Sequence, residues 1–188
     1  AIQKRTGVTF VYITHDQGEA LAMSDRVGVM SHGKLQQVAN PRDIYNNPVN
    51  GFVASFVGEN NIMTGDVQNA GDGMASFATP IGTFRARLGE QAKGTSVKLY
   101  VRPEHVTLSA TPGVENSVPV TIADVSFEGN FISVQATTDK GTLMVAVLRN
   151  DGSATVPGAG SRMHMTFDAQ RSSILPDTSG PVAASAGA

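Results

Sequence analysis

A series of short strand-like runs, separated by turn-forming residues, dominates the sequence after Gly58. Beyond Asn60 no helical period of useful length is present, while glycine, proline, asparagine and aspartate recur between apolar runs. Short strands at such spacing are typical of a small antiparallel barrel or sandwich. The 20 glycines, 9 prolines and low charged content of 16% favour the same β-rich body. The predicted strands are 61–67, 74–79, 81–87, 96–102, 118–127, 130–138, 142–148 and 161–168.

The first 58 residues have a different, mixed pattern. Residues 8–13 form a near-continuous apolar run, which is typical of a strand covered on both faces in a parallel sheet. Asp16 and Glu19 have the spacing of a capping box and predict a short helix over 20–24. The elements predicted after it are strand 26–30, a turn at 31–34, strand 35–38, and helices near 41–46 and 48–57, each opened by an Asn-Pro pair (Asn40-Pro41 and Asn47-Pro48).

The change of pattern predicts a division of the chain into residues 1–58, residues 59–178 and a tail of small residues, 179–188, which we expect to be disordered. The sequence begins with Ala1, lacks an initiator methionine and enters a buried-strand pattern within a few residues. We therefore expect a C-terminal fragment of a longer protein.

Composition excludes several classes of protein. With no cysteine, the chain has no disulfide framework, thiol nucleophile or cysteine metal cluster. No apolar run approaches the roughly 20 residues that span a bilayer. Residues 1–58 carry 5 basic and 4 acidic residues, net +1, and the remainder carries 9 basic and 12 acidic, net −3. A nucleic-acid-binding barrel needs a basic groove with stacking aromatics, so the charge argues against that function.

His15 is the most informative candidate site residue. It lies where the predicted buried strand passes into a helix, and ligands of open α/β sheets bind beyond the carboxyl ends of strands. An imidazole there can donate a hydrogen bond to a phosphate. Spacing alone favours a loop histidine beside an ordinary helix cap. The run Gly28–Leu35 comes close to a phosphate-binding loop, but Leu35 replaces the hydroxyl residue and a strand pattern follows, so we predict a hairpin turn.

Two further groups are candidates for binding an effector. Arg102 and Glu104 follow the apolar strand Val97–Val101. They could form a charged loop that faces a ligand, or a surface pair where Pro103 ends the strand. Asp124 and Glu128 accompany two aromatics, a combination that can hold an organic cation or form a solvated hairpin. No catalytic constellation and no metal ligands are predicted from the residues alone.

Three segments together resemble the end of an ABC-transporter ATPase domain: Phe10–Val38, Asn40–Tyr45 and Phe52–Gly58. They are similar to the switch-histidine strand, its following helix, and the closing hairpin and helices of importer ATPases for polyamines, ferric iron and sugars. Val101–Val106 and Phe127–Gly129 resemble the TOBE regulatory domain of such ATPases, an OB-like β-barrel. The ending Phe56–Asn61 is most similar to polyamine importers. Gly18 departs from the family, which usually has an acidic residue at that position.

The resemblance implies a mainly β fold, an OB-like antiparallel barrel preceded by an α/β remnant of a P-loop ATPase domain. It implies that His15 contacts the γ-phosphate of ATP, that the parent uses ATP and Mg²⁺, and that its partners are a second copy of the subunit and transmembrane permease subunits. It places the parent in the cytoplasm, peripheral on the inner face of the membrane, with a small-molecule effector at the barrel and no nucleic acid.

The sequence lacks a true phosphate-binding loop, a Walker B run and a Ser-Gly-Gly-Gln signature. Because phosphoryl transfer depends on positioning and charge supplied by such parts, we expect this chain alone neither to bind ATP tightly nor to hydrolyse it, and to need no cofactor. Unpaired strand edges in residues 1–57 predict disorder, pairing with a second copy, or packing on the barrel in a non-parental way. The alternative function is a stand-alone ligand-binding regulatory barrel, or an importer ATPase for ferric iron or sugar.

Overall fold

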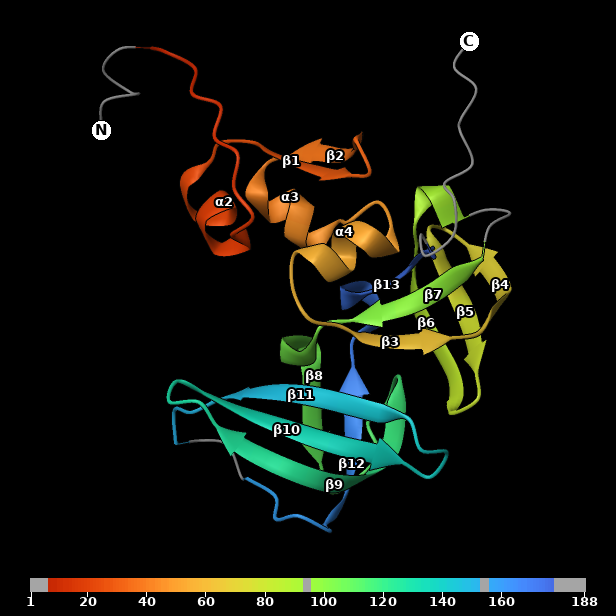
Figure 1. Cartoon of the computed structure of the whole chain (residues 1–188). Coiled ribbons are helices and arrows are strands. Elements are labelled where there is room, and N and C mark those ends of the chain that lie inside the picture. The colour runs from red at the N-terminus through yellow and green to blue at the C-terminus, as the bar shows by residue number, and fades with distance from the viewer. Residues whose placement is uncertain (1–6, 93–95, 153–155, 178–188) are drawn as a thin grey trace.

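The computed structural model of the chain describes residues 7–92, 96–152 and 156–177, and strands make up most of its regular structure. Two large sheets form the β body, and a small hairpin with three short helices lies against it (Figure 1). The mainly β, OB-like fold expected from the sequence is confirmed. The predicted tail 179–188 lies outside the described residues.

A five-stranded antiparallel sheet has the order β11-β10-β9-β12-β8. Its strands bury alternate side chains, as Val118, Val120 and Ile122 do along β9. The strands are β8 (Val106–Ser109), β9 (Ser117–Phe127), β10 (Phe131–Thr138), β11 (Leu143–Arg149) and β12 (Arg162–Phe167).

A six-stranded sheet has the order β3-β7-β13-β6-β5-β4. One pairing departs from the antiparallel expectation, because β13 runs parallel to β6, with Ser173 opposite Arg87. The strands are β3 (Asn61–Thr64), β4 (Asp66–Gly71), β5 (Met74–Thr79), β6 (Gly82–Leu88), β7 (Val97–Val101) and β13 (Ser172–Pro176), with short 3₁₀ turns η1 (Glu90–Ala92), η2 (Pro103–His105) and η3 (Ala169–Arg171).

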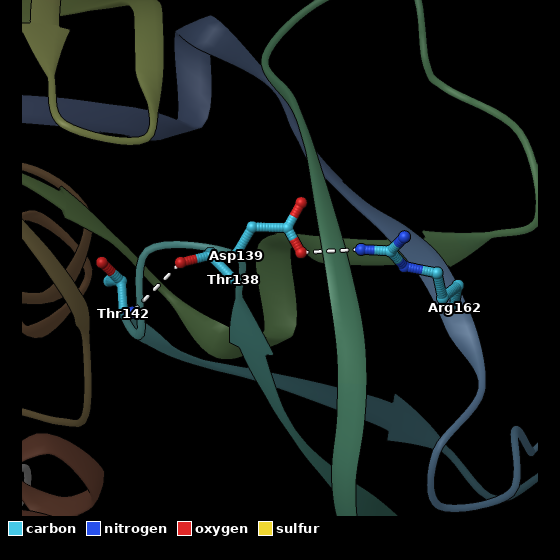
Figure 2. A network of polar contacts seen from close by, with 4 residues as sticks. All are labelled: Thr138, Asp139, Thr142 and Arg162. Carbon is cyan, nitrogen blue, oxygen red and sulfur yellow. Dashed lines mark hydrogen bonds and ion pairs between the residues drawn. The ribbon is translucent and has the colours of Figure 1, made fainter.

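One hydrophobic core joins the two sheets. Phe84 on β6 contacts Phe167 on β12, with ring centroids 5.3 Å apart. Tilted aromatic contacts of this kind add to the stabilisation from burial. Within the five-stranded sheet, Asp139 at the β10–β11 turn makes an exposed ion pair with Arg162 of β12 across β9 (Figure 2). The two sheets therefore fold as one body.

The hairpin and helices have a small core of their own, built on Val29, Ile44, Val53 and Val57. The hairpin turn predicted inside Gly28–Leu35 is present. His32 and Gly33, its two central residues, both have positive φ, which tight two-residue hairpin turns require. These elements are α2 (Gln17–Met23), β1 (Val27–Ser31), β2 (Lys34–Ala39), α3 (Pro41–Asn46) and α4 (Gly51–Phe56).

Three details of the N-terminal segment differ from the sequence prediction. Residues 8–13 form no strand, and Val8, Phe10, Val11, Tyr12 and Ile13 are 52–92% exposed, because none of the described strands lies beside them to pair. The last helix begins at Gly51 because Asn50, not Asn47, accepts the capping hydrogen bond; Asn47 ends α3 instead. Of the alternatives expected for this segment, disorder does not apply to residues 17–57, which fold and pack on the β body, as another of those alternatives expected.

Candidate functional site

The N-terminal segment meets the β body at a tightly packed junction. Ala54 of α4, Tyr100 of β7 and Leu175 of β13 form one buried cluster. Gly51 allows this approach, since a Cβ at that position would lie 2.0 Å from the Tyr100 hydroxyl oxygen and 3.1 Å from the Pro176 carbonyl oxygen. Burial, with the charge of Asp177, raises the pKa of Tyr100 to about 12. Helix α4 and the six-stranded sheet are thus in direct contact.

Arg102, a predicted effector residue, lies inside this junction and is only 6% exposed. Its guanidinium donates to the carbonyl oxygens of Glu59 (3.1 Å) and Tyr45 (3.2 Å) and stacks 4.2 Å from the centre of the Tyr45 ring. Burial lowers the pKa of Arg102, against the opposing effects of Tyr45 and Glu104. Arg102 therefore joins the β body to α3 through neutral acceptors and an aromatic face.

Glu104, the other candidate in that loop, accepts a hydrogen bond from the Tyr45 hydroxyl. Burial first, and then this bond and the charge of Glu104, raise the pKa of Tyr45 to about 12. Tyr45 thus links Arg102 and Glu104 through its carbonyl, ring and hydroxyl. The structure brings these two candidates together as contacts between the N-terminal segment and the β body.

A cavity of about 400 Å³ opens beside these contacts. Its volume falls within the roughly 300–1,000 Å³ of small-molecule sites. Arg87, Arg102 and Arg171 line it together with His105, and no carboxylate does. The other lining residues are Tyr45, Asn46, Asn47, Pro48, Ala54, Asn60, Tyr100, Gln170, Ser173 and Leu175.

Arg87 and Arg171 were not singled out from the sequence. The Arg87 side chain reaches Asn47, 40 residues earlier, and Ser173, 86 residues later, so no local spacing indicates the site. In the predicted strand 81–87, Arg87 falls on the face opposite Phe84 and Ala86, where alternation predicts an exposed residue, so the sequence gives no signal for its partial burial.

His15 lies directly before Asp16, the residue that caps α2 by accepting a hydrogen bond from the Glu19 amide. Its side chain is exposed and makes no hydrogen bond or ion pair within the described residues. The Glu19 carboxylate accepts from the Thr14 and Tyr12 hydroxyls, at 3.2 and 3.3 Å, and so holds the chain just before His15 against the helix. An imidazole at this position is accessible to a ligand approaching from outside the chain.

Asp124 and Glu128 lie on β9 of the five-stranded sheet and in the turn after it, whereas Arg102 follows β7 of the six-stranded sheet. Both carboxylates are exposed, and Asp124 accepts a hydrogen bond from the Ser126 hydroxyl at 3.1 Å. Phe127 and Phe131 beside them are 70% and 49% exposed. Within the part of the chain that the structure describes, no hydrogen bond or ion pair joins this pair to Arg102 and Glu104.

Among the described residues, no group of three or more histidine, aspartate or glutamate side chains is placed to hold a metal ion. In the same part of the chain, none of the helices is long and apolar enough to cross a membrane.

Comparison with known proteins identifies relatives. Residues 99–175 match the family model described as the TOBE domain. The chain is 35% identical over 177 residues to the spermidine/putrescine import ATP-binding protein PotA of Ruegeria pomeroyi, covering 94% of this chain and 48% of that protein. The PotA 1 protein of Pseudomonas aeruginosa is 35% identical over 179 residues, again covering 94% of this chain and 48% of the relative. That of Pseudomonas fluorescens is 47% identical over 110 residues, 57% of this chain and 30% of the relative.

The chain therefore spans about half the length of the curated relatives it matches, and the match lies in their C-terminal part. The resemblance to importer ATP-binding subunits and the TOBE domain expected from the sequence are confirmed. Among solved structures, the molybdate-bound crystal form of the cytoplasmic molybdate-binding protein ModG aligns with a TM-score of 0.53 at 16% identity, covering 62% of this chain and 95% of that one. At that identity the likeness supports the fold alone.

Proposed function

We propose that this chain is the C-terminal part of the ATP-binding subunit of an ABC importer for polyamines. Its residues 99–175 match the TOBE domain, and the chain matches the C-terminal part of spermidine/putrescine import ATP-binding proteins. The supporting observation is the continuity of the match, since one alignment at 35% identity covers 94% of the chain. It therefore includes both the segment that carries His15 and the β body.

In this proposal residues 1–58 complete the ATPase domain, residues 59–178 form the regulatory barrel, and 179–188 are a tail. The separate small core around Val29 and Ile44 supports such a division. His15 contacts the γ-phosphate of ATP bound by the parent, and its exposed position before the capped start of α2 supports that role. A hydrogen bond donated by a ring nitrogen of the His15 imidazole, Nε2 or Nδ1, would form only when the γ-phosphate is present.

The parent uses ATP and Mg²⁺, which polarises the phosphates when bound. Because no phosphate-binding loop or Walker B run is present in this sequence, the residues that hold the nucleotide come from elsewhere in the parent. The chain works with a second copy of the subunit and with transmembrane permease subunits, on the cytoplasmic face of the membrane. The junction through Arg102, Tyr45 and Glu104 supports coupling between the barrel and the ATPase segment.

The decisive experiment joins this chain to the upstream part of the Ruegeria pomeroyi relative and measures Mg-ATP hydrolysis. We expect turnover by the fusion and none by this chain alone, with the intact relative as the positive control. An inactive fusion that is folded by circular dichroism would contradict the proposal and favour the stand-alone regulatory barrel. Turnover by the chain alone would contradict the expectation that the residues which hold the nucleotide lie elsewhere in the parent.

The effector of the barrel is proposed to be a polyamine held by Asp124 and Glu128 beside Phe127 and Phe131, where carboxylates and aromatic faces both attract an organic cation. Calorimetric titration with putrescine and spermidine should give saturable binding of one of them, with maltose as a control. Ferric citrate, compared with citrate alone, tests the iron alternative.

The double variant Asp124→Asn, Glu128→Gln should weaken polyamine binding, whereas Glu115→Gln, which removes an exposed carboxylate elsewhere, should not. If neither polyamine gives a binding isotherm, the barrel does not bind a polyamine effector, and its remaining proposed role is dimerisation.

A further inference from the structure

The cavity beside the junction has a charge opposite to that of the molecule. The whole chain has a formal net charge of −2, yet the charged residues that line this cavity are Arg87, Arg102 and Arg171. None of the described residues that line it is a carboxylate, and the imidazole of His105 adds a further potential donor. A partly enclosed space with several cations and no counter-charge attracts anions, because the surrounding protein screens charges less than water does.

Arg87 has no carboxylate within ion-pair distance among the described residues. Its guanidinium donates to three neutral oxygens: the Asn47 side chain (2.8 Å), the Asn46 carbonyl (2.9 Å) and the Ser173 hydroxyl (3.0 Å). Its Nε is buried and has no acceptor in the described residues. These contacts hold the guanidinium in place but leave its charge uncompensated, and burial lowers the pKa of Arg87 accordingly.

Arg102 also makes no ion pair among the described residues, although the nearby Glu104 partly compensates its charge. Its hydrogen bonds go to carbonyl oxygens and its face lies on Tyr45. Glu104, the carboxylate closest to it in sequence, accepts from the Tyr45 hydroxyl and does not line the cavity. Arg102 therefore contributes positive charge to the cavity.

Arg171 is the exposed member of the set, and its side chain makes no ion pair within the described residues. It ends η3, where its carbonyl oxygen lies 3.3 Å from Nδ1 of His105. A long, unpaired guanidinium at the opening of the cavity can close over a ligand with two parallel hydrogen bonds, which is the geometry that arginine uses for phosphate and carboxylate.

We propose that this cavity binds a small multivalent oxyanion, held by Arg87 and Arg171, with Arg102 contributing charge behind them. The ligand chemistry is a compact group of anionic oxygens, either inorganic phosphate or a small organic polycarboxylate. Because the lining comes from both the α3–α4 segment and the six-stranded sheet, an anion bound there stabilises the junction between them. Anion binding in this cavity needs only residues of this chain and does not depend on the proposed transport function.

The test titrates the purified 188-residue chain with inorganic phosphate and, separately, with citrate in a chloride buffer, by calorimetry. We expect saturable binding of at least one of the two at one site per chain, weakening as salt is raised. Binding of phosphate alone identifies an inorganic ligand, and binding of citrate alone identifies an organic one. The same ligand should raise the melting temperature, because ligands that bind only the folded state stabilise it.

Arg171→Gln is the main variant, since an exposed side chain can be replaced without disturbing the core. It should weaken binding about tenfold or more, as expected for the loss of a charge-assisted hydrogen bond. Arg149→Gln is the matched control, an exposed arginine of β11 that does not line the cavity, and it should bind like the original chain. Absence of saturable binding by both anions, or equal weakening by the two variants, would overturn the proposal.

Discussion

The side-chain amide of Asn61 makes both of the hydrogen bonds that a neighbouring strand would make to the backbone of Val145. Its Oδ1 accepts from the Val145 amide at 2.7 Å, and its Nδ2 donates to the Val145 carbonyl at 2.8 Å. Asn61 belongs to β3 and Val145 to β11, so this one side chain joins the six-stranded sheet to an edge of the five-stranded sheet. Buried backbone groups must be paired, and Asn61 pairs two of them.

Replacing Asn61 with leucine should therefore lower the free energy of unfolding by about 2 kcal/mol, because two hydrogen bonds of about 1 kcal/mol each are lost. Asn61 is 5% exposed, so water does not freely replace its amide. Urea unfolding followed by circular dichroism measures the difference. Asn130→Ala, in the exposed β9–β10 turn, should change it by less than about 0.5 kcal/mol. Equal effects would mean that the Asn61–Val145 contact does not hold the sheets together.

Most individual strands and the hairpin could be predicted from the sequence, because alternation and turn residues are local signals. Three strands of the β body were missed, and one of them is β4 (Asp66–Gly71), because the single predicted run 61–67 covers β3 and only the start of β4. The runs 106–109 and 172–176 are short and partly polar, and β13 forms only between the distant β6 and β7. Strand pairing across such distances leaves no local periodicity.

The candidate sites divide in the same way. His15 could be singled out because it stands beside a strand pattern and a cap. The roles of Arg102 and Glu104 depend on Tyr45, 57 and 59 residues earlier, and the basic cavity collects arginines from three separate elements. Long-range contacts of this kind become visible only in the folded chain.

Gly51→Ala should disturb the packing of α4 on the β body. The added Cβ would lie 2.0 Å from the Tyr100 hydroxyl oxygen and 2.7 Å from the adjacent ring carbon, and Tyr100 is buried. Overpacking at such a site costs about 1–3 kcal/mol, which thermal unfolding would detect as a lower melting temperature. The matched change, Gly71→Ala in β4, meets nothing within 4 Å and should have little effect. If both variants melt alike, the close approach of α4 to β7 does not stabilise the protein.

The β10–β11 turn allows a direct comparison of an ion pair with a buried hydrogen bond (Figure 2). Asp139 and Arg162 are paired at 2.7 Å, but their side chains are 64% and 73% exposed, so Asp139→Asn should cost less than about 0.5 kcal/mol. Thr138 is buried and its hydroxyl accepts from the Thr142 amide at 3.0 Å, so Thr138→Val should cost about 1 kcal/mol.

Urea unfolding of both turn variants, at low and at high salt, separates the two contributions. The Asp139→Asn effect should shrink further at high salt, because exposed charges are screened, while the Thr138→Val effect should not change. A larger loss from Asp139→Asn at either salt concentration would contradict this ranking.

His15→Ala should abolish most of the ATP hydrolysis of the fusion to the upstream part of the Ruegeria pomeroyi relative. Loss of one hydrogen-bond donor aimed at transition-state charge typically lowers kcat on the order of 100-fold or more. His32→Ala is the matched control, because His32 is an exposed histidine in the β1–β2 turn whose ring contacts only the neighbouring Ser31 hydroxyl. Single-turnover hydrolysis and nucleotide binding are measured for both. We expect His15→Ala to keep nucleotide binding and lose turnover, and equal turnover by the two variants would exclude His15 as the residue that contacts the γ-phosphate.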